Sequence, residues 1–299
     1  DDIYKEPFAK KNNFVLHYGD VTDSLSVFNI IKKIKPNEIY NLAAQSHVAV
    51  SFEIPEYTTN ADALGTLRIL ESIVKLNRKI KFYQAGSSEM FGKVYETPQT
   101  EKTPFYPRSP YGVAKLYSHW ITINYRESYK IFASNGILFN HESPLRGETF
   151  VTKKVVKALC NIKHNKQKKL FVGNLYSKRD WGHAQDYVKA MWKILQHKQP
   201  DDFVICTGKQ YTIKQFINLV AQELNMKIKW KGKGIKEKAY NEKNRCIIEC
   251  KRKYLRPAEV DTLKGNFSKA KKLLKWKPEN DIKSLIKDMV NYELNSILR

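Results

Sequence analysis

The chain has 299 residues, which is enough to bury a sizeable core as one large domain or two smaller ones. Its apolar content of 42% and its 17 tyrosines are typical of a globular protein and exclude a disordered one. No apolar run approaches the ~20 residues of a membrane span, and residues 1–5 lack the apolar core of a signal peptide. We therefore expect no membrane partner.

The chain is strongly basic, with a formal net charge of +23 at pH 7. Such an excess is typical of nucleic-acid binding proteins. Here, however, the lysines are spread along the chain, with short clusters at residues 163–169 and 231–238 and no recognition motif beside them. We expect a diffuse surface bias or an aid in attracting an anionic ligand, and no nucleic-acid partner.

The four cysteines are few and scattered. Neither a zinc site nor a disulfide framework has their spacing, so we expect a reducing cytoplasm and no bound metal. They are Cys160, Cys206, Cys246 and Cys250.

Strand-like and helix-like patterns alternate through the first half of the chain. This rhythm predicts an α/β fold, a Rossmann-like, doubly wound parallel sheet covered by helices. The expected strands are residues 14–19, 38–44, 79–85 and 133–140, and the expected helices are residues 24–35, 55–75, 110–129 and 148–165.

The second half contains shorter elements, which predict a smaller α/β lobe partly interleaved with the first. We expect a Rossmann-like domain at residues 1–165, to which later segments return, and a second lobe at residues 166–299. Residues 232–252 are polar and lysine-rich and are predicted to form a mobile loop. The other expected elements are residues 169–173, 183–197, 203–208, 212–224, 227–231 and two closing helices.

A dinucleotide fold of this kind is expected to open with a strand, a glycine-rich turn and a helix that receives a pyrophosphate. The sequence holds no such glycine-rich motif. It starts inside what resembles the connection to a later strand. We therefore expect an N-terminally truncated sheet and weakened cofactor binding, either because the sequence is a fragment or because the protein is a remnant.

The most informative residues are a Ser-x-Glu at the end of a predicted strand and a Tyr-x-x-x-Lys on the helix that follows the next loop, before another predicted strand. Tyr111 and Lys115 share one helical face, one turn apart. An ammonium group beside a phenol favours the phenolate, which is a competent base for an alcohol. Ser87 and Glu89 add a hydroxyl group and a carboxylate at the end of an apolar run. The alternative is a chance tyrosine–lysine pair on a solvated helix.

These motifs resemble the GDP-mannose 4,6-dehydratase family of the extended short-chain dehydrogenases/reductases. The resemblance covers essentially the whole chain, and its motifs are specific to that family rather than to the superfamily. The segments that carry it are residues 82–92, 103–111, 124–129, 135–144, 179–183 and 256–260.

The resemblance implies an NADP-dependent hydro-lyase that converts GDP-mannose to GDP-4-keto-6-deoxy-mannose, the first step towards GDP-fucose and related deoxysugars. It implies that Ser87, Glu89, Tyr111 and Lys115 are the catalytic residues and that the complete protein is a homo-oligomer, a dimer or tetramer. Ser87 stands where the family usually has threonine, which keeps the hydroxyl group. The alternatives are another nucleotide-sugar dehydratase or epimerase, and an inactive remnant or binding subunit.

The resemblance also implies a cofactor-binding set. Asp20 could instead serve only to form a turn at the end of its strand. The small residues after residue 41 could instead serve only to allow tight packing between a strand and a helix. One departure is Leu145-Arg146, where the family usually has two arginines. The implied cofactor residues are Asp20, Val21, Leu42, Ala43, Ala44, Gln45, Ser46, Tyr57, Lys115, His141 and Arg146.

The implied substrate set contains two arginines, whose planar fork suits a pyrophosphate group. For Arg179 the alternative is a surface ion pair with Asp180. We also expect His47 to have a structural role and Trp120 and Trp192 to lie in the core. The implied substrate residues are Asn140, Lys154, Arg179, Arg256 and Glu259.

Overall fold

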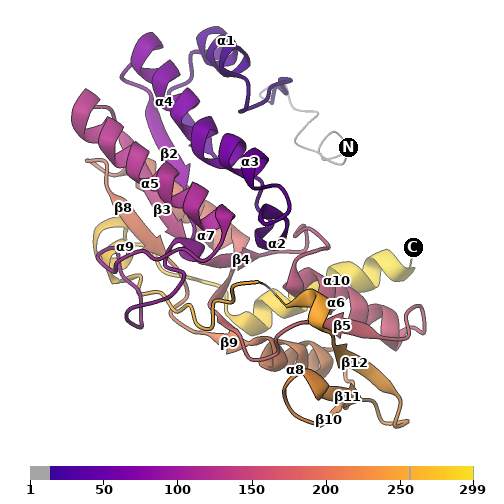
Figure 1. The fold of residues 1–299 in the computed structure, drawn as a ribbon. Coiled ribbons are helices and arrows are strands. Elements are labelled where there is room, and N and C mark those ends of the chain that lie inside the picture. The colour runs from indigo at the N-terminus through magenta and orange to yellow at the C-terminus, as the bar shows by residue number, and fades with distance from the viewer. Residues whose placement is uncertain (1–13, 256, 299) are drawn as a thin grey trace.

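The computed structural model describes residues 14–255 and 257–298. Its first sheet has four parallel strands in the order β1-β2-β3-β8 (Figure 1). The parallel sheet of the predicted Rossmann-like fold is confirmed. The strands are β1 (Glu38–Asn41), β2 (Lys81–Ala85), β3 (Ala133–Leu138) and β8 (Asp202–Ile205).

Helices cover both faces of this sheet, as in a doubly wound fold. On one face α1 (Ser24–Ile34), α4 (Gly65–Leu76) and α5 (Pro110–Tyr129) bury a cluster that includes Ile73 and Phe82. On the other face, α7 (Ala184–Gln196) and α9 (Ser268–Leu274) bury a second cluster around Tyr187 and Phe203. Cover on both faces explains why β2, β3 and β8 are buried at almost every position rather than at alternate ones.

Local signals set the limits of α5, the longest helix. The Ser109 side chain accepts a hydrogen bond from the Gly112 N–H group at 3.0 Å, and Pro110 occupies the first turn. The helix ends at Lys130, which adopts a left-handed conformation. The predicted bounds of this helix are confirmed.

The helix predicted at residues 55–75 is divided into three parts. A short α3 (Pro55–Thr58) leads into the π-helical turn η3 (Thr59–Leu64), and α4 follows. A π-helical turn adds a residue to the helix and changes the direction of the side chains next to it. Asp62 lies in this turn and is buried.

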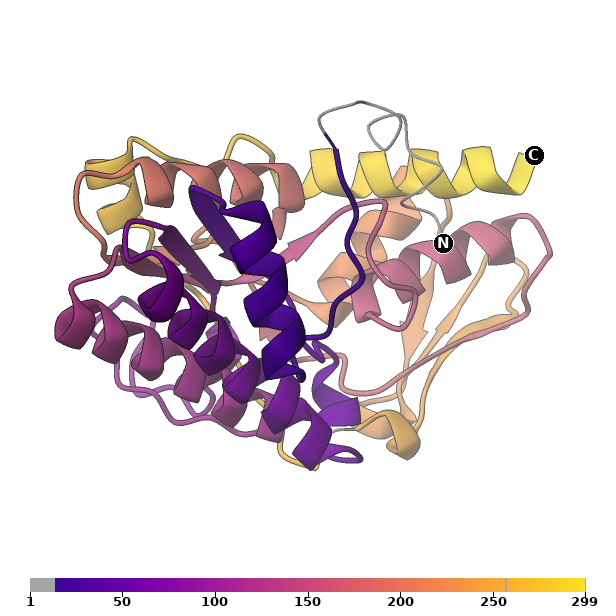
Figure 2. The same ribbon diagram turned by 90° about the horizontal axis from the view of Figure 1, so that it is seen from above.

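A second lobe packs beside the first sheet, with α10 extending over its outer side (Figure 2). Helices α6 (Val151–Lys163), α8 (Ile213–Glu223) and α10 (Ile282–Leu298) share one apolar core with a mixed sheet. The strands of that sheet, in spatial order, are β10 (Lys229–Lys231), β11 (Lys238–Tyr240), β12 (Cys246–Cys250) and β5 (Leu170–Val172).

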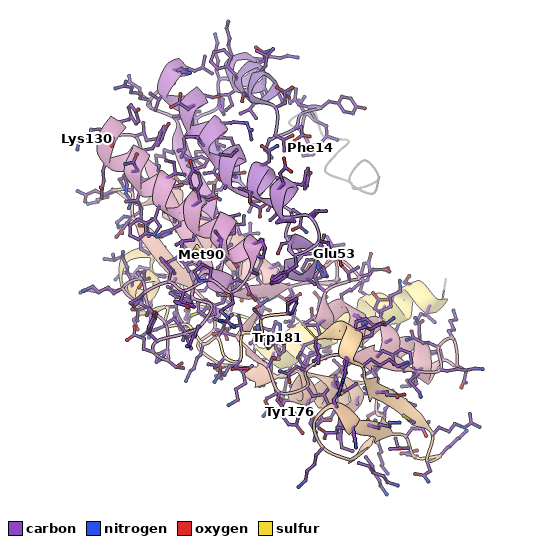
Figure 3. All side chains as sticks on the ribbon, in the orientation of Figure 1. Phe14, Glu53, Met90, Lys130, Tyr176 and Trp181 are labelled. Carbon is purple, nitrogen blue, oxygen red and sulfur yellow. The ribbon has the colours of Figure 1, made fainter. Side chains whose placement is uncertain are left out.

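Two short strand pairs join the lobes. Strand β4 (Asn140–Glu142) pairs with β7 (Trp181–His183), and β6 (Lys178–Arg179) pairs with β9 (Tyr211–Thr212). Trp181 lies at this junction (Figure 3). The division into residues 1–165 and 166–299 stays a prediction. The remaining elements are α2 (Val48–Ser51) and the 3-10 turns η4 (Ser88–Met90), η5 (Gly234–Lys236) and η6 (Arg252–Tyr254).

Two predicted elements are wrong. Residues 14–19 have no strand conformation in the described structure and are not part of any of its sheets. Residues 232–252 are not a loop, since they contain β11 and β12, and Ile247 and Ile248 are buried in the second core. The lysines of this region obscured the pattern because they project outward, as in the ion pair of Lys238 with Glu249.

Trp120 and Trp192 were predicted in the core and are each 56% exposed. Their helical spacing among apolar residues did not show whether they lie on the buried face of the helix or at the solvent-exposed edge of that face. Among the described residues, no helix is both long and apolar enough to cross a bilayer.

Candidate active site

A cavity of about 790 Å³ opens between the first sheet and the second lobe. Its lining residues follow the carboxyl ends of three adjacent parallel strands: Leu42 follows β1, Ser87 follows β2 and Asn140 follows β3. Doubly wound sheets bind ligands at this edge. A second cavity of about 870 Å³ lies beside α5 and is lined by Trp120 and Asp202, but by none of the predicted site residues.

All four predicted catalytic residues line the first cavity, of about 790 Å³. We call the part of its lining formed by Ser87, Glu89, Tyr111 and Lys115 the inner wall of the main cavity. Each is at most 9% exposed. Ser87 caps η4 by accepting a hydrogen bond from the Glu89 N–H group at 3.2 Å. This cap holds the hydroxyl group and the carboxylate on one short turn after β2.

Lys115 donates a hydrogen bond to the Ala85 carbonyl oxygen at 3.1 Å, which ties α5 to the end of β2. Its Nζ lies 5.9 Å from the centre of the Tyr111 ring. Burial raises the pKa of Tyr111 above its ordinary value, and the hydrogen bond with Ser87 opposes this. The expectation that Lys115 lowers the pKa of this phenol is therefore wrong for this arrangement. Burial also lowers the pKa of Lys115.

Arg179 connects the inner wall to the second lobe. Its Nη2 lies 3.9 Å from Oε1 of Glu89 and 3.5 Å from Oε1 of Glu259, and its Nη1 donates to the Val260 carbonyl oxygen at 2.7 Å. Both Arg179 and Asp180 are at most 5% exposed, so the alternative of a surface ion pair is wrong. The guanidinium group instead lies between two carboxylates of the cavity.

The other predicted substrate residues have different surroundings. Asn140 lines the cavity with its side-chain oxygen buried and unpaired within the described structure. Lys154 also lines it, 3.8 Å above the ring of Tyr254, and burial lowers the pKa of Lys154. Arg256 lies outside the described residues. The cavity thus presents polar groups that are ready to contact a ligand.

His141 and Arg146 line the same cavity beyond Asn140. His141 stacks on Tyr187 with ring centroids 4.6 Å apart, and burial lowers its pKa to about 4, so the imidazole is neutral at pH 7. Arg146 pairs with Glu142 at 3.1 Å and lies 3.6 Å above the ring of Phe150. The positively charged guanidinium group of Arg146 is therefore held in place at this end of the cavity.

The segment of residues 42–46 forms the outer wall of the cavity. Leu42 and Ala44 line the cavity with Ser46, whereas the Ala43 N–H group bonds to Asn41 and the Gln45 N–H group bonds to Asp62. Leu42 is 56% exposed. Alternate residues of this wall, Leu42, Ala44 and Ser46, therefore line the cavity, whereas Ala43 and Gln45 do not.

The remaining predicted cofactor residues do not line the cavity in the described structure. Asp20 is exposed and accepts hydrogen bonds from the N–H and hydroxyl groups of Thr22, which lower its pKa. This is the geometry of the simple turn that was its alternative. The Val21 carbonyl oxygen accepts from Arg68, and Tyr57 is half-exposed.

Four further residues of the site were missed or underrated. Trp181 and Phe150 line the cavity from the second lobe. His47 caps α2, which fits its structural prediction, and also lines the cavity. Asp62 does not line the cavity but accepts a hydrogen bond from the Gln45 N–H group of its outer wall, and it carried no signal because apolar periodicity does not reveal a π-helical turn.

Solved structures show the same fold. RMD from Pseudomonas aeruginosa, determined with NADPH, matches with a TM-score of 0.81 and 23% identity, over 95% of this chain and 89% of that one. The dTDP-glucose 4,6-dehydratase of Bacillus anthracis, determined with NAD, matches with a TM-score of 0.79 and 20% identity, over 98% and 83%. The chain therefore shares the fold of these two nucleotide-binding proteins, and its Ser87, Glu89, Tyr111 and Lys115 line the cavity at the carboxyl edge of the parallel sheet.

Sequence comparison narrows the class further. The family model of GDP-mannose 4,6 dehydratase matches residues 1–289. A GDP-mannose 4,6-dehydratase of Vibrio cholerae is 53% identical over 98% of this chain and 82% of that protein, and one of Cricetulus griseus is 48% identical over 98% and 80%. The chain belongs to the GDP-mannose 4,6-dehydratase family.

Proposed function

We propose that this protein is a GDP-mannose 4,6-dehydratase that uses NADP. The observation that carries the proposal is the buried carboxylate of Glu89 on the wall that also holds Ser87 and Tyr111, in a chain of this family. A reductase or epimerase of the same fold needs the Tyr–Lys pair for redox chemistry at C4. Only a dehydratase needs a carboxylate to remove a proton from C5.

The chain's own residues supply the proton transfers. Tyr111 takes the O4 proton of the sugar, which requires its raised pKa to fall when the substrate and cofactor are bound. The resulting 4-ketone acidifies C5, and Glu89 removes that proton. Water then leaves from C6, with the proton supplied by protonated Glu89 or through Ser87. A nicotinamide bound here would supply the acceptor for the C4 hydride and the donor that returns it to C6. The return of hydride to C6 is balanced by a proton returned to C5 from whichever of Tyr111 and Glu89 still holds one.

The residues present fit a nicotinamide cofactor on the side of the cavity that carries the outer wall. Gly86 lies so close to the neighbouring strand that an added Cβ would stand 2.9 Å from the Gly136 carbonyl oxygen, and small residues are needed along this edge. Lys115 on the inner wall, and His141 and Arg146 beyond Asn140, supply hydrogen-bonding and charged groups to the same cavity. The cation of Arg146 is the basis for proposing NADP rather than NAD.

The nucleotide sugar would lie between the inner wall and the second lobe. The buried, unpaired oxygen of Asn140 and the ammonium group of Lys154 face this part of the cavity. Glu259 is placed to accept hydrogen bonds from a sugar hydroxyl group. We assign Arg179 and Arg256 to the pyrophosphate group. A homo-oligomer in the cytoplasm, without nucleic-acid or membrane partners, completes the proposal.

The test is Glu89→Gln, which keeps the size of the side chain and removes the base. The overall rate with GDP-mannose and NADP should fall by roughly 10²–10⁴. Because Tyr111 and Lys115 are untouched, a single turnover should still produce the absorbance of the reduced cofactor. That absorbance should persist, and solvent deuterium should not enter C5.

The matched control is Glu53→Gln, on an exposed site outside the cavity, which should turn over like the unaltered protein. Normal turnover of Glu89→Gln would refute the role of the carboxylate. If the unaltered protein released a 4-epimer of the sugar without loss of water, the proposed dehydratase activity would be refuted.

A further inference from the structure

The positive charge of the chain is concentrated in one segment of the second lobe. Residues 227–253 contain eleven lysines and arginines and three glutamates, a net charge of +8 in a chain whose net charge is +23. This segment includes β10, β11, β12 and most of η6. The proposed mechanism gives none of its basic side chains a task, so the concentration of charge calls for a reason.

Strand geometry places several of these lysines on the outer face of the mixed sheet. Ala239 and Ile248 belong to the core of the second lobe. Because successive side chains of a strand point to opposite faces, their neighbours Lys238 and Glu249 point outward. Lys231 lies directly opposite Lys238 in the pairing of β10 with β11. Two like charges in register destabilise a sheet, so stability does not explain this arrangement.

Other lysines extend this surface towards β5. Nζ of Lys169 lies 2.9 Å from Oε2 of Glu249, and Nζ of Lys238 lies 3.6 Å from Oε1 of the same carboxylate. Nζ of Lys251 lies 4.1 Å from the centre of the Phe171 ring. Four ammonium groups therefore surround one carboxylate and one ring. We call these four lysines the basic face: Lys169, Lys231, Lys238 and Lys251.

The basic face meets the main cavity at the end of β5. The Lys251 N–H group donates to the Val172 carbonyl oxygen at 2.9 Å, and Val172 lines the cavity. Lys253 and Tyr254, in η6, line it as well. The Tyr254 ring has two ammonium groups beside it, since Nζ of Lys154 lies 3.8 Å and Nζ of Lys253 lies 5.0 Å from its centre. Positive charge thus continues from the sheet into the lining of the cavity.

We propose that the basic face attracts the anionic nucleoside diphosphate group of the substrate and guides it into the cavity past Lys253 and Lys154. Charge of one sign beside a cleft raises the local concentration of an oppositely charged ligand and can raise its association rate by roughly 10–10³. The four lysines are not among the residues that line the cavity, so they should affect association and not dissociation. The inference rests on the proposed function only for the identity of the sugar, because any nucleoside diphosphate carries the charge.

The test variant combines Lys231→Gln, Lys238→Gln and Lys251→Gln. GDP serves as the probe, and the tryptophan fluorescence of the full chain reports binding in stopped flow, since Trp181 lines the cavity. At low ionic strength the association rate constant should fall about three- to tenfold, and the dissociation rate constant should stay the same. At 1 M salt, where the Debye length is about 3 Å, the variant and the unaltered protein should associate at the same rate.

The matched control combines Lys32→Gln, Lys33→Gln and Lys79→Gln, which lowers the net charge by the same amount. These exposed lysines precede the amino ends of β1 and β2, whereas the cavity lies at the carboxyl ends. Figure 1 shows α1, which carries two of them, at the opposite end of the molecule from β10. Association should slow by less than about twofold. An equal fall in both triple variants would overturn the proposal, because the net charge alone would then explain it.

Glu249→Gln tests the proposal with the opposite sign. It removes the carboxylate that Lys169 and Lys238 share, so GDP should associate about twofold faster at low ionic strength. A loss of folding cannot imitate this result. An unchanged association rate in this variant and in the triple variant of the basic face, or a failure of the unaltered protein to bind GDP, would overturn the proposal.

The two proposals fail in different ways. If GDP association responds to the basic face as expected while the unaltered protein does not dehydrate GDP-mannose, only the proposed function is wrong. If GDP-mannose is dehydrated while the association rate ignores these charges, only the role of the basic face is wrong.

Discussion

The two walls of the cavity differ in how firmly the protein itself holds them. The inner wall residues are nearly inaccessible, and Ser87 and Lys115 bond to neighbouring elements of the fold. On the outer wall, Leu42 is largely exposed, and the segment is held mainly through its backbone N–H groups. The groups proposed for chemistry are thus preorganised by the core, whereas Leu42 on the outer wall exposes apolar surface that a ligand could cover.

This difference has an energetic consequence. Changes on the inner wall disturb the protein and the reaction together, because the same packing holds both. Changes on the outer wall remove contacts with the ligand and leave the free energy of unfolding nearly unchanged. Substitutions on each wall therefore test whether the inner wall is held by the protein core and the outer wall is not.

The largest effect is expected for Tyr111→Phe on the inner wall. Loss of the hydroxyl group removes the base that takes the O4 proton, so kcat should fall by about 10³. The measurement is the single-turnover rate of hydride transfer. Tyr117→Phe, a half-exposed tyrosine on the same helix, should retain normal rates. Equal losses in both variants would mean that α5 as a whole, rather than this phenol, limits the reaction.

Gly112→Ala should come next, because it disturbs the inner wall without removing a functional group. An added Cβ would lie 2.9 Å from the Glu89 carbonyl oxygen. The clash should move Glu89, lower kcat by about 10² and lower the free energy of unfolding by about 1–3 kcal/mol. Chemical denaturation and steady-state kinetics measure both. Val113→Ala, exposed on the same turn, is the control, and a normal kcat in Gly112→Ala would show that the wall is not tightly held.

The smallest effect is expected on the outer wall, for Leu42→Ala. Loss of apolar area that a cofactor would cover should raise its Kd by roughly tenfold, equivalent to about 1.4 kcal/mol. The free energy of unfolding should change by less than about 0.5 kcal/mol. Calorimetric titration with NADP and thermal unfolding measure the two quantities, with exposed Leu25→Ala on α1 as the control. A strongly destabilised Leu42→Ala would erase the distinction between the walls.

Much of the first lobe could be predicted because its signals are local. Ser109 and Pro110 define the start of α5, and the alternation of apolar strands with amphipathic helices predicts a parallel sheet. The second lobe was harder. Residues 238–250 have many charged side chains, and only their pairing with β5 and β10 makes them strands.

The candidate site shows the same limit. The resemblance identified Ser87, Glu89, Tyr111 and Lys115, and the structure brings all four to one wall. It did not predict that burial would raise the pKa of Tyr111, against the opposing effect of the hydrogen bond with Ser87. Desolvation depends on everything that surrounds a group, including residues far away in the sequence.

By itself, the sequence determined the helices with caps, the parallel sheet and the residue types proposed for proton transfer, because each depends on neighbours within a few positions or on a motif. Only the tertiary structure decided that Arg179 lies between Glu89 and Glu259, and that the Asp62 carbonyl oxygen accepts a hydrogen bond from Ser118 on α5. Those contacts join residues that are between 56 and 90 positions apart in the sequence. Periodicity carries no information at that range, since folding alone brings such groups together and removes the water around them.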